Sequence, residues 1–200
     1  MSAAIDFYFD FSSPYGYMMS ERIDALASRH GRSVRWRPFL LGAVFKHTGA
    51  QPSPKVPLKG EYAEHDMARS ARFLELPFQW PEAFPVSTHQ AARAFYWIEE
   101  QDAQKAHDFA QAVFRTYFVD GRDVSQLDAV LDCAAAQGID RDALAAAVAD
   151  DAVKNRLREV CDDVIERKVF GSPFIVIDGE PFWGVDRLPQ IERWLEKGGF

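Results

Sequence analysis

The chain has 200 residues, enough for one domain or a small domain with an insertion, and its 48% hydrophobic and 26% charged content is that of a globular protein. A net charge of −7 without a basic cluster argues against nucleic acid or an anionic membrane as the main partner. We find no signal-peptide pattern before the first expected strand and no apolar run long enough to span a bilayer, and we therefore expect a cytoplasmic protein.

The cysteines and histidines show neither a metal-binding nor a disulfide pattern. Cys133 and Cys161 fall in helical patterns without a CxxC spacing, which predicts buried, reduced side chains. The five histidines are not spaced as ligands, and we expect no metal site.

The first predicted elements are a strand and a helix that meet at Ser13. Phe7, Phe9 and Phe11 alternate with polar or smaller residues, which is the period of a strand. Pro14 suits the first turn of a helix, and apolar residues then recur every three or four positions up to Ala27. A helix N-terminus favours a developing anion, because its N–H groups are unpaired and the helix dipole is positive there.

The segment Ser13-Pro14-Tyr15-Gly16 has the layout of a C-P-Y-C redox motif in which both cysteines are replaced. Such a chain cannot exchange a disulfide itself, but the Ser13 hydroxyl can donate a hydrogen bond to the thiolate of a ligand. An ordinary helix N-cap is the alternative interpretation of Ser13.

The rest of the chain predicts a long helical stretch between two groups of strands. Residues 34–37 alternate as a second strand, residues 58–168 are helical in pattern, and 174–177 form an apolar strand buried on both faces. Asp178-Gly179 is typical of a type I′ hairpin turn, and residues 181–183 form the returning strand. The final helix, with Leu188 and Ile191 on its apolar face, is expected to be capped by Asp186.

This order predicts an α/β protein with a thioredoxin-like fold, in which a large all-helical domain is inserted between the βαβ and ββα halves. We expect residues 1–41 and 169–200 to form the thioredoxin-like domain and residues 42–168 the helical domain. In such folds a cis-proline faces the helix N-terminus, and Pro173 occupies that position. The backbone of Ser172 can then pair with a peptide, and the Asp186 carboxylate can bind a ligand ammonium.

Three motifs resemble a known family. Ile165 to Leu188 (IERKVFGSPFIVIDGEPFWGVDRL) and Asp6 to Tyr15 (DFYFDFSSPY) closely resemble the bacterial 2-hydroxychromene-2-carboxylate isomerases. Thr48 to Tyr62 (TGAQPSPKVPLKGEY) resembles the kappa-class glutathione transferases, which share the fold and the cofactor. The resemblance covers the whole chain.

The resemblance implies that glutathione binds between the two domains. Ser13 would contact its sulfur, and Ser172 with cis-Pro173 would hold the cysteinyl backbone. The segment Trp183-Gly184-Val185-Asp186 would bind the γ-glutamyl end. Ala50 stands where family members commonly have Asn, which removes a polar side chain near the cofactor.

The family implies a glutathione-dependent cis-trans isomerase of aromatic catabolism, whose thiolate adds reversibly to a conjugated double bond of a small aromatic carboxylate. Lowering a thiol pKa from about 8.5 to about 6.5 needs about 2.7 kcal/mol. A hydrogen bond to the charged sulfur supplies roughly 1.5–3 kcal/mol and the helix end roughly 0.3–1 kcal/mol, so Ser13 and the helix N-terminus together suffice without a general base. Arg37 and Lys46 are candidate partners for the substrate carboxylate, or simply solvated charges.

Two other functions stay open at this point. One is a kappa-like glutathione transferase that conjugates electrophiles and consumes glutathione. The other is a non-catalytic thioredoxin-like module that binds thiols or peptides without turnover. The presence of Ala50, where family members commonly have Asn, favours this alternative. The resemblance also leaves a homodimer open, although no apolar stripe demands a partner chain.

Overall fold

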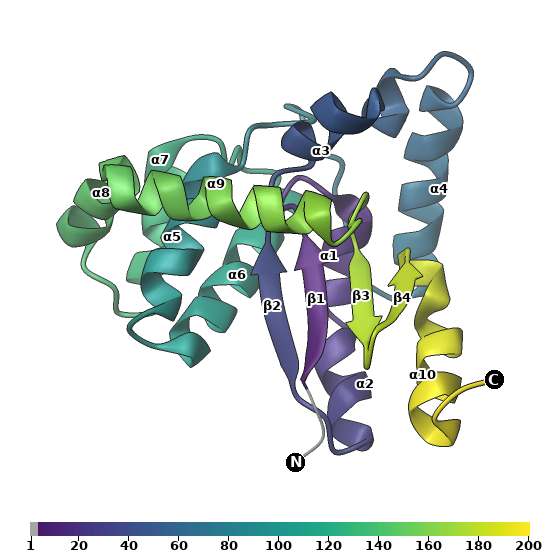
Figure 1. The fold of residues 1–200 in the computed structure, drawn as a ribbon. Helices are drawn as coiled ribbons and strands as arrows, with labels where there is room; N and C mark the ends of the chain where they lie inside the picture. Colours follow the sequence, from purple (N-terminus) through teal and green to yellow (C-terminus); the bar gives the residue numbers. More distant parts are fainter. Residues whose placement is uncertain (1–3) are drawn as a thin grey trace.

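The computed structural model describes residues 4–200, and a four-stranded sheet lies at its centre (Figure 1). The strands run in the order β2-β1-β3-β4 and comprise β1 (Ile5–Phe9), β2 (Val34–Pro38), β3 (Phe174–Ile177) and β4 (Glu180–Trp183). β1 and β2 are parallel, whereas β3 is antiparallel to both β1 and β4. Tyr8 lies opposite Phe174, so the first and third strands are neighbours in the sheet, as a thioredoxin-like fold requires.

The helix predicted after β1 is divided in two. α1 (Pro14–Ser20) and α2 (Ile23–Arg29) are separated by a turn at Glu21 and Arg22. The Arg22 N–H bonds to Met19 O, three residues back, and the φ of Arg22 is −126°, outside the helical range. The two helices still connect β1 to β2, as a parallel βαβ unit requires.

The chain between β2 and β3 is mainly helical, as the sequence predicts for residues 58–168, but residues 74–88 contain no helix. Its elements are α3 (Leu41–Thr48), the 3₁₀ turn η1 (Ser53–Lys55), α4 (Gly60–Phe73), α5 (His89–Glu99), α6 (Ala103–Phe118), α7 (Leu127–Ala135), α8 (Arg141–Ala149) and α9 (Asp151–Glu166). The apolar stripe of α6 is fully buried, and its Phe114 ring lies 5.2 Å from the rings of Phe9 and Phe11. The inserted helices and the sheet therefore share one hydrophobic core. Burying each such ring contributes about 1.5–3 kcal/mol to the stability of the fold. The proposed boundaries at residues 41 and 169 stay predictions.

The C-terminal part follows the predicted hairpin but not the predicted helix cap. Asp178 and Gly179 have φ values of 53° and 93°, as the two central residues of a type I′ turn require. After β4 the chain makes the 3₁₀ turn η2 (Val185–Arg187) before α10 (Leu188–Lys197). The prediction that Asp186 caps the last helix is wrong, because η2 shifts the start of α10 and leaves Arg187 at the cap without a side-chain hydrogen bond.

Both cysteines, Cys133 and Cys161, are free and buried, as predicted. Within residues 4–200 no helix is both long and apolar enough to cross a membrane. The described part of the chain also contains no group of three His, Cys, Asp or Glu side chains arranged to hold a metal ion.

Candidate active site

Ser13 lies at the junction of β1 and α1, where the sequence predicts it. It is the N-cap of α1, and its Oγ accepts a hydrogen bond from the Gly16 N–H at 3.0 Å. The same hydroxyl donates to the backbone oxygen of Ser172 at 2.9 Å. Only 6% of Ser13 is exposed, so a ligand atom that bonds to this hydroxyl must reach nearly into the core. The Ser13 oxygen therefore makes both the cap bond to Gly16 and the bond to the distant Ser172 of the same chain.

The Ser172–Pro173 peptide bond is cis, as predicted, and three segments are joined at it. The Ser172 Oγ accepts the Asp10 N–H at 3.0 Å, and the Pro173 oxygen accepts the Gly184 N–H at 3.1 Å. With the bond from Ser13, these contacts fix the backbone around Pro173 to the end of β1, to α1 and to the segment before η2.

Gly16 explains why the second cysteine position of the motif holds the smallest residue. A Cβ at Gly16 would lie 3.0 Å from the Ser172 Oγ and 3.1 Å from the Ser13 Cβ. Such distances are shorter than ordinary van der Waals contact, so a side chain here would require Ser13 or Ser172 to shift by a small amount. Gly16 therefore leaves room for the two serine side chains to lie close together.

The segment that the family resemblance assigns to the γ-glutamyl end is divided between core and solvent. Val185 is 7% exposed and packs into the core, so only its backbone can face a ligand. The Asp186 side chain is 69% exposed and pairs only loosely with Arg187, at 3.4 Å. Trp183 is 55% exposed, with its ring 4.9 Å from that of Phe170. η2 also packs against α1, which brings this segment next to the helix that Ser13 begins.

The structure does not bring Arg37 and Lys46 into direct contact with these residues. The Arg37 Nε lies 3.5 Å from the Asp6 carboxylate, on the β2 edge of the sheet, and Lys46 is exposed on α3. Among residues 4–200 no hydrogen bond or ion pair joins either cation to Ser13 or Ser172.

Asp10 is a central residue of the site that the sequence analysis missed. Its carboxylate is buried and accepts hydrogen bonds from the Ser12 N–H and hydroxyl, from the Thr88 hydroxyl and from the Leu41 N–H, at 2.7 to 2.8 Å. Burial raises the pKa of Asp10, and these hydrogen bonds oppose the rise. Asp10 thus ties the start of α3 and the residue before α5 to Ser172, which its own N–H contacts. The one available signal was a charged residue inside an aromatic strand pattern.

A second missed contact holds α4 against α1. The Tyr15 hydroxyl donates to the Asp66 carboxylate at 2.5 Å, and Asp66 also forms an ion pair with Arg69. Burial, and then the bond to Asp66, raises the pKa of Tyr15, so this phenol stays protonated at neutral pH. The same bond lowers the pKa of Asp66. Because its proton is held by Asp66, Tyr15 acts here as a link between helices beside Ser13.

Comparisons with known proteins agree on the fold and the family. The family model described as a DSBA-like thioredoxin domain matches residues 4–196. A 2-hydroxychromene-2-carboxylate isomerase of Pseudomonas sp. (strain C18) is 31% identical over 94% of this chain and 88% of its own. Glutathione S-transferase kappa 2 of Caenorhabditis elegans is 28% identical over 96% of this chain and 91% of its own.

Among solved structures, one of a 2-hydroxychromene-2-carboxylate isomerase superposes with a TM-score of 0.87 at 28% identity, and covers 98% of this chain and 95% of that one. The match extends through both groups of strands and the helices between them. The chain therefore belongs to the DSBA-like thioredoxin-domain family, among the 2-hydroxychromene-2-carboxylate isomerases.

Proposed function

We propose that the protein is a glutathione-dependent cis-trans isomerase of the 2-hydroxychromene-2-carboxylate type, acting on a small aromatic carboxylate. The observation that carries this proposal is the Ser13 hydroxyl, held at the N-terminus of α1 directly against the backbone next to cis-Pro173. Relatives with that name, and kappa-class glutathione transferases, align over nearly the whole chain and support both the reaction type and the cofactor.

The residues present fit glutathione. Ser172 and Pro173 would hold its cysteinyl backbone, Ser13 its sulfur, and Gly184, Val185 and Asp186 its γ-glutamyl end, beside the Trp183 ring. In the described part of the chain the exposed Asp186 carboxylate pairs only with Arg187, at 3.4 Å, which leaves it available to an ammonium group. When bound, glutathione supplies a thiolate that adds reversibly to a conjugated double bond, which can then rotate.

Ser13 can serve that thiolate by a rotation of its hydroxyl alone. In the structure the Ser13 proton is donated to the Ser172 oxygen, while the Ser13 oxygen accepts from Gly16. Turning the O–H bond toward a sulfur keeps the cap to Gly16 and releases the Ser172 oxygen. That oxygen then becomes available to accept a peptide N–H, so binding of backbone and sulfur would be coupled through one serine.

This rotation stabilises the thiolate less than a hydrogen bond from a previously unpaired hydroxyl would, because the bond to Ser172 is lost. A hydrogen bond to a charged atom contributes roughly 1.5–3 kcal/mol, but the neutral bond to Ser172 that is given up contributes about 1 kcal/mol. The net of about 0.5–2 kcal/mol adds to the field at the α1 N-terminus, worth roughly 0.3–1 kcal/mol. The thiol pKa should therefore fall by about one to two units.

Arg37 and Lys46 stay proposed partners of the substrate carboxylate. The Arg37 Nε is buried and faces the Asp6 carboxylate at 3.5 Å, so this nitrogen could bind a substrate carboxylate only by leaving that ion pair. We also propose a cytoplasmic location, in keeping with the free, buried cysteines, and leave a homodimer open.

The test is to follow 2-hydroxychromene-2-carboxylate and total glutathione together. An isomerase converts many equivalents of substrate while the thiol concentration stays constant. A transferase consumes one thiol for each product molecule, and a binding module gives no turnover. Either of the last two results would overturn the proposal.

A further inference from the structure

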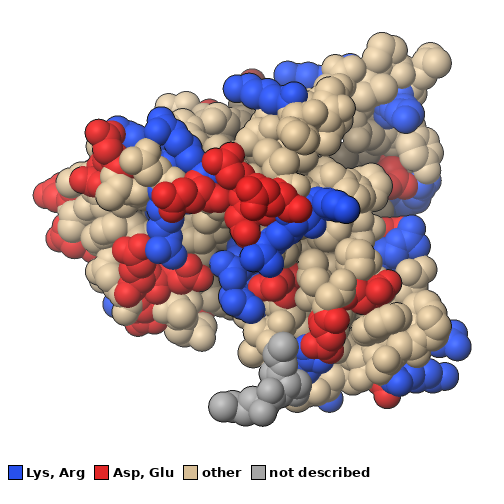
Figure 2. All heavy atoms as spheres, in the orientation of Figure 1, with Lys and Arg blue, Asp and Glu red and all other residues tan. Residues whose placement is uncertain are grey.

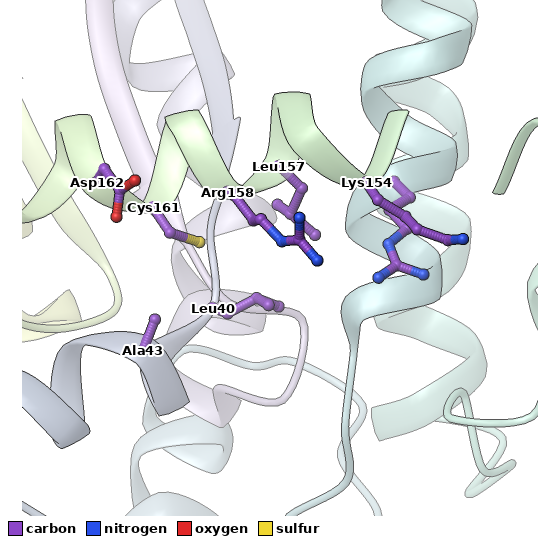
Figure 3. A pocket seen from close by; sticks show the side chains of 8 residues that line it. Leu40, Ala43, Lys154, Leu157, Arg158, Cys161 and Asp162 are labelled. Carbon is purple, nitrogen blue, oxygen red and sulfur yellow. The ribbon is translucent and has the colours of Figure 1, made fainter. Parts of the chain in front are cut away.

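A cavity of about 360 Å³ lies between α9, the start of α3 and α5, outside the residues proposed to bind glutathione. One side of it is apolar and is formed by Leu40, Leu157 and Cys161. Figure 3 shows five side chains that project from one face of α9, on the side of Leu40 and Ala43: Lys154, Leu157, Arg158, Cys161 and Asp162. The volume is in the range of small-molecule sites.

Three cations, Arg93, Lys154 and Arg158, line this cavity against a single carboxylate, that of Asp162. This excess of positive charge is local, because the protein carries a net charge of −7. Blue and red side chains lie interspersed where α9 crosses the face drawn in Figure 2. The cavity therefore differs from its surroundings in charge.

The three cations differ in what they contact. Lys154 pairs with Asp151 at 2.9 Å, and Arg158 donates to the Asn155 side chain at 2.8 Å. The Arg93 Nε is buried and has no hydrogen-bond partner among residues 4–200. Burial, and then the nearby Arg158 charge, lowers the pKa of Arg93, and among residues 4–200 no carboxylate forms an ion pair with this guanidinium. A buried donor without a partner costs free energy that a bound anion would offset.

The cavity is joined to the candidate active site through Asp10. Leu40 precedes Leu41, whose N–H bonds to the Asp10 carboxylate, and Thr88, which precedes the helix of Arg93, bonds to the same carboxylate. The Asp10 N–H in turn contacts Ser172. The cavity thus lies at the carboxyl ends of the parallel strands β1 and β2, where ligands bind in open α/β sheets.

We propose that this cavity binds a small aromatic carboxylate, with the carboxylate on Arg93 and Arg158 and the ring against Leu40 and Leu157. A planar guanidinium matches a carboxylate with two parallel hydrogen bonds, and the apolar side favours a ring over a fully polar anion. The occupant is either the reactant of the enzyme or a separate acid of the same chemistry. If it is the reactant, Arg93 and Arg158 replace Arg37 and Lys46 as the partners of its carboxylate.

Calorimetry with salicylate tests the site, with glutathione absent and at saturation. We expect Arg93→Gln to weaken salicylate binding about tenfold or more, because it removes a charge-assisted hydrogen bond. Arg158→Gln, at an exposed position, should weaken binding without risk to the fold. The matched control is Arg29→Gln, which removes the same charge from an exposed position on α2 and should bind as the wild type does. Benzyl alcohol, which lacks the carboxylate, should not bind.

Absence of salicylate binding, or equal affinity in the wild type and both cavity variants, would overturn the proposal. Turnover then distinguishes the two sources of the ligand. A raised KM in Arg93→Gln, with unchanged glutathione affinity, identifies the reactant, and an unchanged KM identifies a separate acid. Both support the site, since salicylate binding is measured without any turnover and does not depend on the proposed isomerase activity.

Discussion

Ser13→Ala is the most informative change, because it deletes one hydroxyl that makes two hydrogen bonds. The substitution removes the donor to the Ser172 oxygen and the acceptor for the Gly16 N–H. Loss of the cap should cost about 0.5–2 kcal/mol of the free energy of unfolding. In a chain of this size each kcal/mol lowers the melting temperature by about 2–4 °C, so the variant should fold.

The functional loss follows from the bond that the hydroxyl exchanges. With about 0.5–2 kcal/mol of net stabilisation of the thiolate at stake, Ser13→Ala should lower turnover by about twofold to thirtyfold. Had the hydroxyl been unpaired in the free protein, the loss would reach about a hundredfold. Glutathione should still bind, because the Ser172 backbone and Asp186 are unchanged.

The assay is the ultraviolet absorbance of the thiolate when glutathione is added, measured across a pH series. In the wild type this absorbance should develop one to two pH units below that of free glutathione, and in Ser13→Ala it should shift back toward free glutathione. Asp140→Ala is the matched control, because it removes the N-cap of α8, which bonds the Ala143 N–H at 2.8 Å. That variant should lose similar stability and keep the thiolate signal. If Ser13→Ala kept both the signal and full turnover, Ser13 would be only a cap.

Three further predictions concern other contacts of the site and the fold. Asp186→Asn should keep the melting temperature, since Asp186 makes no cap bond. It should weaken glutathione binding, measured by calorimetry, about twofold to fivefold, as expected for the loss of an exposed ion pair. A glutathione affinity equal to that of a Glu180→Gln control would contradict a role for the Asp186 charge. Gly16→Ala should displace Ser13 or Ser172 and reduce turnover. The control is Gly42→Ala on α3, where a Cβ meets nothing within 4 Å; it should raise the free energy of unfolding by about 0.5–1 kcal/mol and leave turnover unchanged. Full activity in Gly16→Ala would show that the close approach of the two serines is dispensable. The hydrogen bond to Asp24, opposed by burial and supported by Asp108, raises the pKa of His107. The stability that His107 contributes is therefore complete below the unfolded pKa of about 6.5 and is lost as pH rises through the higher folded pKa. The melting temperature measured across this pH range should lose this pH dependence in His107→Gln and keep it in a control variant of the exposed His65.

Ser12 illustrates how the structure changes the choice of a control. From the sequence it is the neighbour of Ser13 on the alternate side of the chain. In the structure its N–H and hydroxyl both donate to the buried Asp10 carboxylate at 2.8 Å. Ser12→Ala therefore disturbs the residue that orients Ser172, and a cap far from the site is the better comparison.

The sequence by itself determined the elements whose pattern is local. The strand around Phe7, the start of a helix at Pro14, the hairpin at Asp178-Gly179 and the long helical stretch follow from periodicity and turn chemistry within a few residues. The position of Ser13 at a helix N-terminus follows in the same way, because a cap depends only on the residues beside it.

Only the tertiary structure decided which polar groups meet and which are buried. Asp10 contacts Ser172 across 162 positions of the sequence, and Arg93 comes to line a cavity with α9 through the packing of separate helices. Asp186 lost its predicted cap role because a 3₁₀ turn intervenes before α10. Burial and partnership are properties of elements far apart in the chain, and a periodic pattern reports which face is apolar but not what that face will lie against.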